Sequence, residues 1–292
     1  QKKNATSLPI VEYGYASSTK IADSKMFELQ TKTSHWTLFV NAGLGYSSVS
    51  RMQNCGLDIH GGFDWTLGGG IYRQMLLHNN LRIGIDLGID LGSSMFKIDG
   101  FYKEQYSAVD ADGGPYQRNV SINNYKEKFS HIVVGIPMAL RFDYFLGRKW
   151  KEHHTSIFLR AGVIPNIDIK QRTKATFDAL YSGYYDWLFD LTIDQNGIYD
   201  FGQYSLDEKS SSTAIDKFNL ATIASIGASY WLSKKVQLDC ALQYQGTVKS
   251  KVSTADDYHL STAKSEWQSA TYMMQKAEYH NITFKIQLNY NF

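Results

Sequence analysis

Eight segments of this chain alternate apolar and polar residues with a period of two, as a β-strand with two unlike faces does. In one of them every odd position from 81 to 91 is Leu or Ile, and every even position from 82 to 92 is Arg, Gly or Asp. All reach the nine to eleven or so residues that a tilted membrane strand needs, whereas soluble strands average about five or six. The segments are 36–48, 63–73, 81–96, 129–145, 155–169, 217–232, 236–249 and 279–292.

The connections between these segments alternate in length. Those at 49–62, 97–128, 170–216 and 250–278 are long, and those at 74–80, 146–154 and 233–235 are short. Outer-membrane barrels combine short periplasmic turns with long extracellular loops, and an even strand number returns both termini to the periplasm. A soluble sandwich can also bury one face, but it has no reason to alternate its loops. The sequence therefore predicts an all-β, eight-stranded antiparallel transmembrane β-barrel with long extracellular loops over residues 35–292, after a periplasmic N-terminal segment at 1–34.

Composition narrows the function classes. The 20 tyrosines and 14% aromatic residues favour strands. A formal net charge of +2 gives no support for nucleic-acid binding. The longest apolar run, 132–140, is far shorter than the roughly 20 residues of a membrane helix. The start at Gln1 has no apolar signal core, from which we infer that an export signal has been removed. Cys55, in a predicted loop, and Cys240, in a predicted strand, are expected to stay unpaired.

The last strand ends in "FKIQLNYNF", residues 284–292, whose even positions are all apolar or aromatic. We expect this strand to close the barrel against the first one, with these side chains facing lipid. In bacterial outer-membrane proteins, which the chain resembles here, a C-terminal aromatic residue is the mark that the barrel-assembly machinery recognises. The resemblance therefore implies that Phe292 is an assembly signal; an interfacial aromatic residue without that role is the alternative.

A family resemblance is strongest at "FSHIVVGIPMALRFDYFLG", residues 129–147, where Ile136-Pro137 is followed by three apolar residues and Arg141. The segments "SIFLRAGVIPNI" and "FNLATIASIGASYWLSKKVQLDCALQYQGTV" continue it. The chain resembles the PorT-type outer-membrane β-barrel family of Bacteroidota, an OmpA-like small barrel, over roughly residues 34–292. It departs from the family at Gly135, where an acidic residue is commoner, and in its long third loop. The resemblance implies a fold and a location in the outer membrane of a Gram-negative bacterium, but no single activity.

The polar faces carry charges of both signs. An eight-stranded barrel is only wide enough for side chains to fill it, so opposite charges inside should pair and plug the lumen. The alternative is a narrow ion path, which would need charge of one sign around a continuous gap. The predicted lumen charge network consists of Arg82, Asp86, Asp90, Arg141, Asp143, Arg160, Asp239 and Lys285.

No residue pattern predicts catalysis, a cofactor or a metal. Ser130 and His131 are adjacent on a strand and point to opposite faces, which defeats a direct relay between them. The histidines are dispersed without metal-ligand spacing. Pro137 and Pro165 are expected in one stretch of the seam between neighbouring strands, where neither can donate a hydrogen bond. This predicts a β-bulge or, alternatively, a weakened seam that admits lipid.

The third loop, 170–216, is expected to form a short helix over 177–184 and then a hairpin at Asn196-Gly197. The second loop reads as a hairpin around "DADGGP", residues 110–115. Tyr184, Tyr185 and Trp187 are of types enriched in binding hot spots and are candidate contacts for a protein partner or a glycan.

These observations favour a non-enzymatic accessory subunit of a larger envelope complex for secretion, assembly or uptake, which acts through its loops and N-terminal segment. The expected partners are outer-membrane lipid, a protein of that complex and, during biogenesis, the barrel-assembly machinery. A small-solute pore and a lipid-modifying barrel enzyme are the alternatives.

Overall fold

The computed structural model describes residues 36–49, 56–78, 80–146, 155–211, 213–233, 235–249, 251–252, 258–262, 266–274 and 277–292. The predicted N-terminal segment, 1–34, and Cys55 lie outside these ranges; Cys240 is a free thiol. Within them no helix is long and apolar enough to cross a membrane. The described strands are β1 (Trp36–Val49), β2 (Leu57–His60), β3 (Gly62–His78), β4 (Leu81–Val109), β5 (Pro115–Gly135), β6 (Met138–Leu146), β7 (Thr155–Tyr185), β8 (Leu191–Ile193), β9 (Gly202–Ser211), β10 (Phe218–Trp231), β11 (Val236–Lys249) and β12 (Tyr279–Asn291), with a 3₁₀ helix η1 (Ala270–Met273).

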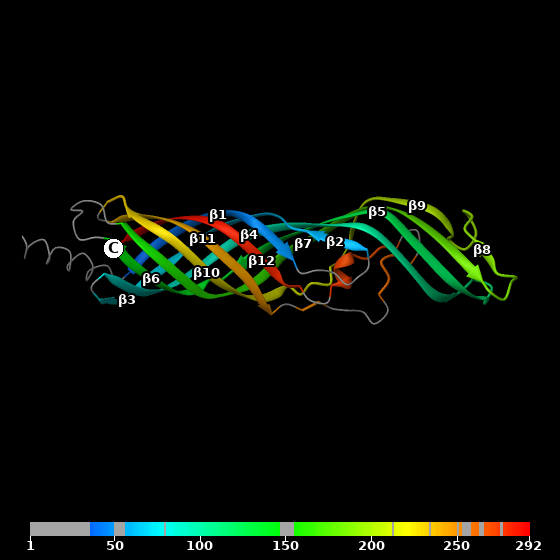
Figure 1. Ribbon diagram of the computed structural model, residues 1–292, viewed down its shortest axis with the longest axis horizontal. Helices are drawn as coiled ribbons and strands as arrows, with labels where there is room; N and C mark the ends of the chain where they lie inside the picture. Colours follow the sequence, from blue (N-terminus) through cyan, green and yellow to red (C-terminus); the bar gives the residue numbers. More distant parts are fainter. Residues whose placement is uncertain are drawn as a thin grey trace, which may run out of the picture.

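The long strands close into an antiparallel ring (Figure 1). The order around the ring is β1, β3, β4, β5 with β6, β7, β10, β11 and β12, and β12 pairs back onto β1. Strands β5 and β6 count as one strand because both lie between β4 and β7. The predicted eight-stranded antiparallel barrel is confirmed. We call the end with the 231–236 connection and the C-terminus the turn end, and the opposite end the loop end.

The break between β5 and β6 falls at Ile136-Pro137. The Gly88 amide donates to the Pro137 carbonyl at 3.0 Å, and the Ile136 amide donates to the Pro165 carbonyl at 3.0 Å. Both prolines therefore lie in one stretch of the seam, as predicted, and each removes one ladder hydrogen bond because it lacks an amide proton. The expected β-bulge is not at the prolines, since the register continues through them and shifts between residues 132 and 133 instead. Lipid access at this seam stays a prediction.

Strands β4, β5 and β7 run on past the barrel at the loop end and form a tall sheet, which β2 and β9 extend at its edges. We call this part the extension; it is the right half of Figure 1. The predicted loops 97–128 and 170–216 are thus mostly strand. The hairpin predicted in the second loop is confirmed, because β4 and β5 pair as far as Val109 and Pro115.

Two expectations for the third loop were wrong. The helix over 177–184 is part of β7, where Ala175, Phe177, Ala179 and Tyr181 all point into the extension with a period of two. Asn196-Gly197 does form a turn, with Gly197 at φ 93°. The segments on either side of it do not pair with each other, because β8 and β9 each pair with β7. Because β7 is long, each of the two segments forms its backbone hydrogen bonds with β7 and not with the other segment.

The inner face of the extension has its own apolar core. A segment between β11 and β12, described at 258–262 and 266–274, covers this face, and we call it the covering segment. The buried residues of this core are Leu57, Phe96, Ile98, Tyr102, Val120, Ile122, Tyr125, Phe129, Ala175, Phe177, Ala179, Tyr181, Leu206, Ile215, Leu260, Trp267, Ala270, Met274 and Ala277.

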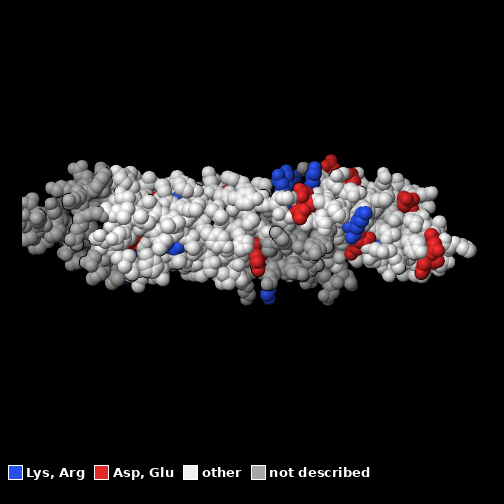
Figure 2. Space-filling model, in the orientation of Figure 1, with Lys and Arg blue, Asp and Glu red and all other residues white. Residues whose placement is uncertain are grey.

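The barrel itself is apolar on the outside. Leu87, Ile89 and Leu91 are exposed, whereas Arg82 and Asp86 on the opposite face are buried. On the face of the molecule that Figure 2 shows, the barrel has almost no charged side chains at its surface, and most of the charged side chains lie over the extension. This is the inside-out pattern of a membrane-spanning barrel and the reverse of a soluble sandwich.

Exposed aromatic residues mark both edges of the apolar surface. Trp36, Tyr144, Tyr230 and Tyr290 lie toward the turn end, and Tyr46, Phe63 and Tyr244 lie toward the loop end. The ten positions of β1 between Trp36 and Tyr46, at about 3.3 Å each and tilted by about 40°, span about 25 Å. That height matches the apolar band of outer-membrane-type barrels, whose interfaces carry aromatic girdles.

Candidate functional site: a closed lumen beneath a folded extension

All eight charged residues predicted to face the lumen are buried, and five ion pairs join them. Arg141 lies at the centre, because it pairs with Asp143 at 2.8 Å and with Asp239 at 2.6 Å. We call the eight residues the ion-pair plug. The other pairs are Arg82 with Asp143 at 3.1 Å, Arg160 with Asp86 at 2.8 Å and Lys285 with Asp90 at 2.8 Å.

Aromatic rings fill the space around these charges. The Arg141 guanidinium lies 4.1 Å from the centre of the Phe158 ring, a favourable cation–π distance. Glycines on the neighbouring strands make room for the rings. A Cβ atom at Gly84 would lie 2.3 Å from the Tyr72 ring, and one at Gly227 would lie 2.5 Å from the Phe158 ring. The turn-end half of the lumen is therefore a packed interior, as expected for eight strands.

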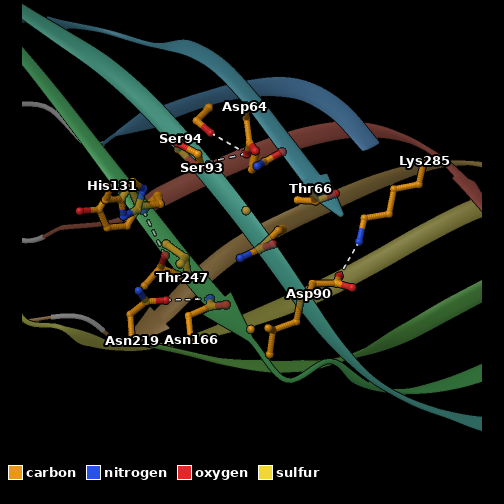
Figure 3. A pocket seen from close by; sticks show the side chains of 18 residues that line it. Asp64, Thr66, Asp90, Ser93, Ser94, His131, Asn166, Asn219, Thr247 and Lys285 are labelled. Atoms are coloured by element: carbon orange, nitrogen blue, oxygen red, sulfur yellow. Dashed lines mark hydrogen bonds and ion pairs between the residues drawn. The ribbon is translucent and has the colours of Figure 1, made fainter. Parts of the chain in front are cut away.

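On the loop-end side of the plug lies a small cavity of about 70 Å³, lined by polar and apolar residues (Figure 3). Liquid water takes up about 30 Å³ per molecule, so the cavity has room for only a few waters. Asp64 lies on its wall and accepts hydrogen bonds from Ser47 at 3.0 Å and from Ser94 at 3.4 Å. Every strand of the ring contributes to its lining: Ser47, Asp64, Asp90, His131, Asn166, Asn219, Gln245 and Lys285.

A buried His–Asp pair stands at the loop-end wall of this cavity. His131 Nδ1 lies 3.2 Å from Asp168, and the ring stacks on Tyr279 with centroids 5.4 Å apart. Ser130 points outward and bonds to a backbone carbonyl, so the predicted separation of Ser130 from His131 holds. Ser94 is the cross-strand neighbour of His131, but its hydroxyl donates to Asp64 instead. These contacts make a structural pair and not a Ser–His–Asp relay.

The covering segment packs on the inner face of the extension at the loop end of the lumen, and a buried carboxylate binds it there. Glu127 on β5 accepts hydrogen bonds from Ser269 Oγ at 2.5 Å, from Tyr125 Oη at 2.6 Å and from the Ala270 amide at 2.9 Å. Trp267 Nε1 donates to Tyr125 Oη at 3.2 Å. Burial raises the pKa of Glu127 above its usual value, although these donors oppose the shift.

The three aromatic residues predicted to contact a partner have different environments. Tyr185 is buried and stacks on Tyr116, so it belongs to a small core of the extension and is not a contact residue. Tyr184 is partly exposed and donates to Asp190 at 2.7 Å. Trp187 is exposed, and its Nε1 donates to the Pro115 carbonyl at 2.6 Å. Phe292, the predicted assembly signal, is exposed at the end of β12.

Sequence reasoning missed His131–Asp168 and the Glu127 contacts. The His131–Asp168 pair could have been found from the sequence, because both residues fall on the inward-facing positions of neighbouring strands. Nothing local signals the contacts of Glu127 with the covering segment, because Ser269 and Ala270 lie 142 and 143 residues from Glu127 in sequence.

No protein-family model and no curated protein matches the chain. Solved structures similar to it include Neisserial surface protein A, at 12% identity over 87% of this chain and 96% of that one, with a TM-score of 0.32. The outer membrane protein OprG from Pseudomonas aeruginosa matches at 10% identity over 88% and 95%, with a TM-score of 0.32. Ail of Yersinia pestis, solved with the heparin analogue sucrose octasulfate, matches at 11% identity over 88% and 99%, with a TM-score of 0.27.

Proposed function

We propose that this protein is an integral barrel of a Gram-negative outer membrane and serves as a non-enzymatic accessory subunit of a larger envelope complex. In this proposal the barrel is an anchor, and the extension holds a binding surface for a protein partner outside the membrane. The resemblance to the PorT-type barrels of Bacteroidota belongs to the same proposal.

The observation that carries the proposal is the folded extension. A barrel needs only short connections to close, yet here β4, β5 and β7 continue well beyond the aromatic girdle. They enclose an apolar core that the covering segment completes. Large folded structures outside the membrane are a common place for binding function, because rigid elements hold contact residues in position.

The closed lumen supports an anchor over the two alternatives. A solute pore needs a continuous gap, whereas paired charges and rings fill the turn-end half and the covering segment lies over the loop end. A lipid-modifying enzyme needs a reactive group that lipid can reach, whereas His131 and Asp168 are buried inside the ring. Both observations favour function at the surface of the extension.

The test is a deletion that spares the large apolar core of the extension and removes only Leu188, Ile193 and Tyr199 from the edge of its small core. Removing residues 177–204 would take away the core residues Phe177 and Tyr181, so the informative deletion is 186–200. Tyr185 and Phe201 remain, and a linker of six Gly and Ser residues, which reaches about 20 Å, joins them. We expect the shortened protein to fold, as its thermal unfolding will show, and to lose the partner that co-purifies with the full chain in mild detergent.

The matched control replaces residues 232–235, the short connection at the turn end, with Gly and Ser. It should keep the partner. If the 186–200 deletion retains every partner of the full chain, the extension is not the binding surface and the proposal is wrong.

A further inference from the structure

The far end of the extension carries several exposed apolar side chains, and packing within the extension does not explain the most exposed of them, Phe189. We call residues 109–115 and 186–200 the tip. Phe189 is 98% exposed, although its neighbour Leu188 packs against the small core of Tyr116, Tyr185 and Phe201. The other exposed apolar residues of the tip are Val109, Trp187, Leu191 and Ile198. An exposed group of large apolar side chains on a folded protein marks a contact surface.

The backbone conformation of Phe189 also indicates a contact role. Phe189 has φ 54°, in the left-handed region that a bulky residue rarely adopts. Asn or Gly would be less strained there, and neither burial nor backbone preference favours Phe. Contact with a partner is a reason for a Phe at this position, because aromatic residues dominate binding hot spots.

The tip is held in place before any partner arrives. Trp187 Nε1 donates to the Pro115 carbonyl, which fastens residues 186–200 to the turn between β4 and β5. The Tyr199 hydroxyl donates to Asp112 across the same two segments. The Phe201 amide donates to the Ile198 carbonyl at 2.8 Å. A surface that is already ordered loses less conformational entropy on binding.

The charge of the tip selects the partner. The tip contains Asp110, Asp112, Asp186, Asp190, Asp194 and Asp200, and no Lys or Arg. The nearest cation in sequence, Arg118, is only 6% exposed and lies over the rings of Tyr181 and Phe201. Figure 2 shows acidic side chains at this end of the molecule. A field of one sign attracts and orients the opposite charge, and it repels anionic lipid headgroups.

We infer that the tip docks a protein surface rich in Lys and Arg, with Phe189 and Trp187 as its apolar anchors. This inference rests on the proposed function and specifies the chemistry of the partner. The Asp residues supply attraction and orientation, and the aromatic rings supply area and cation–π contacts to the basic side chains.

The experiment measures binding of three probes to the full-length protein in nanodiscs of zwitterionic lipid. The probes are 12-residue peptides with repeats of Arg-Tyr, of Glu-Tyr and of Arg-Gly. We expect the Arg-Tyr peptide to bind at least tenfold more tightly than either of the others, and its affinity to fall with added salt. The inference is wrong if the Arg-Tyr and Glu-Tyr peptides bind equally well, or if the Arg-Tyr peptide does not bind. It is also wrong if the protein binds vesicles of anionic lipid and does not bind the Arg-Tyr peptide.

Two variants assign the binding to the tip. The first variant combines four substitutions: Asp186→Asn, Asp190→Asn, Asp194→Asn and Asp200→Asn. Asn has nearly the shape of Asp and also adopts the left-handed backbone conformation, so the variant should fold normally and bind the Arg-Tyr peptide at least tenfold more weakly. Phe189→Ser should weaken the binding several-fold. The controls are the combination of Asp58→Asn, Asp178→Asn and Asp207→Asn, and the single change Phe101→Ser. They alter exposed residues elsewhere on the extension and should leave the affinity for the Arg-Tyr peptide unchanged. If the tip variants match their controls, the inference is wrong.

The same variants separate this inference from the proposed function. If the natural partner is lost with the 186–200 deletion but kept by the Asp→Asn combination and by Phe189→Ser, the partner is not a basic protein held by the tip. In that case the proposed function stands and the inference fails.

Discussion

At the scale of single residues, the molecule is defined by which face of each strand meets lipid. Neighbouring positions on β11 illustrate this: Leu242 is 53% exposed and Gln243 is 3% exposed. In water that arrangement would be unstable, since it exposes the apolar face and buries the polar one. In a bilayer both choices are favourable, because lipid covers Leu242 and Gln243 lies in the polar interior of the barrel.

The residue-scale prediction tests which face of the barrel meets lipid. On β1 the exposed Val40 lies near the middle of the apolar band, four positions from Trp36 and six from Tyr46, so Val40→Arg should reduce the free energy of unfolding by roughly 2 to 4 kcal/mol. Phe101 is similarly exposed but lies on the extension, beyond the girdle, and Phe101→Arg should cost less than about 1 kcal/mol. Denaturant unfolding in lipid vesicles measures both. Equal costs would contradict the placement of the membrane.

At the scale of elements, the covering segment is held to the extension through Glu127. The carboxylate is buried among three donors, and burial raises its pKa above 4.5 in the docked state. When the segment leaves, Glu127 meets water and its pKa returns to its ordinary value. Glu127 therefore binds a proton more tightly in the docked state than in the open state. Docking is strongest when the pH is below the ordinary pKa of Glu, and it weakens as the pH rises through the higher pKa of the docked state.

The element-scale prediction follows from that sign. The Ala270 amide, which donates to Glu127, should be more protected from hydrogen exchange at pH 5 than at pH 8, after correction for the intrinsic exchange rate. Glu127→Gln removes this titrating group, so it should weaken docking and reduce the dependence of the protection on pH; His259, which contacts Glu104 from the same segment, is still present in this variant. Protection that rises with pH in the wild type would contradict this account.

How well the sequence predicts a strand depends on whether the bilayer or another strand determines its conformation. The barrel strands could be predicted because a bilayer imposes the same period of two on each of them, and the inward parity of Arg82 or Asp143 follows directly. Of the extension, only the hairpin of β4 and β5 could be predicted, from its turn residues; the other strands could not, because they pair outside the bilayer with strands far apart in sequence. Phe177, Leu180, Tyr181 and Tyr184 fit a helix locally, and only the neighbouring β5 and β9 make them a strand. The Glu127 contacts need the finished fold.

At the scale of the whole molecule, a closed barrel in the membrane supports a folded body outside it. Eight strands leave a lumen that side chains can fill, and the ion-pair plug, the small cavity and the covering segment succeed one another along it. Breaking a buried ion pair costs several kcal/mol, so these charges hold the lumen closed rather than line a path. In the proposed function, the extension and its tip provide the binding surface.

The most direct test of this account is the conductance of the purified protein in planar bilayers. Because paired charges and aromatic rings fill the lumen, we predict no stable conductance in molar salt across the usual range of voltage, with or without the 186–200 segment. Sustained openings of uniform size from the wild-type protein would contradict the closed lumen and would favour a small-solute pore instead.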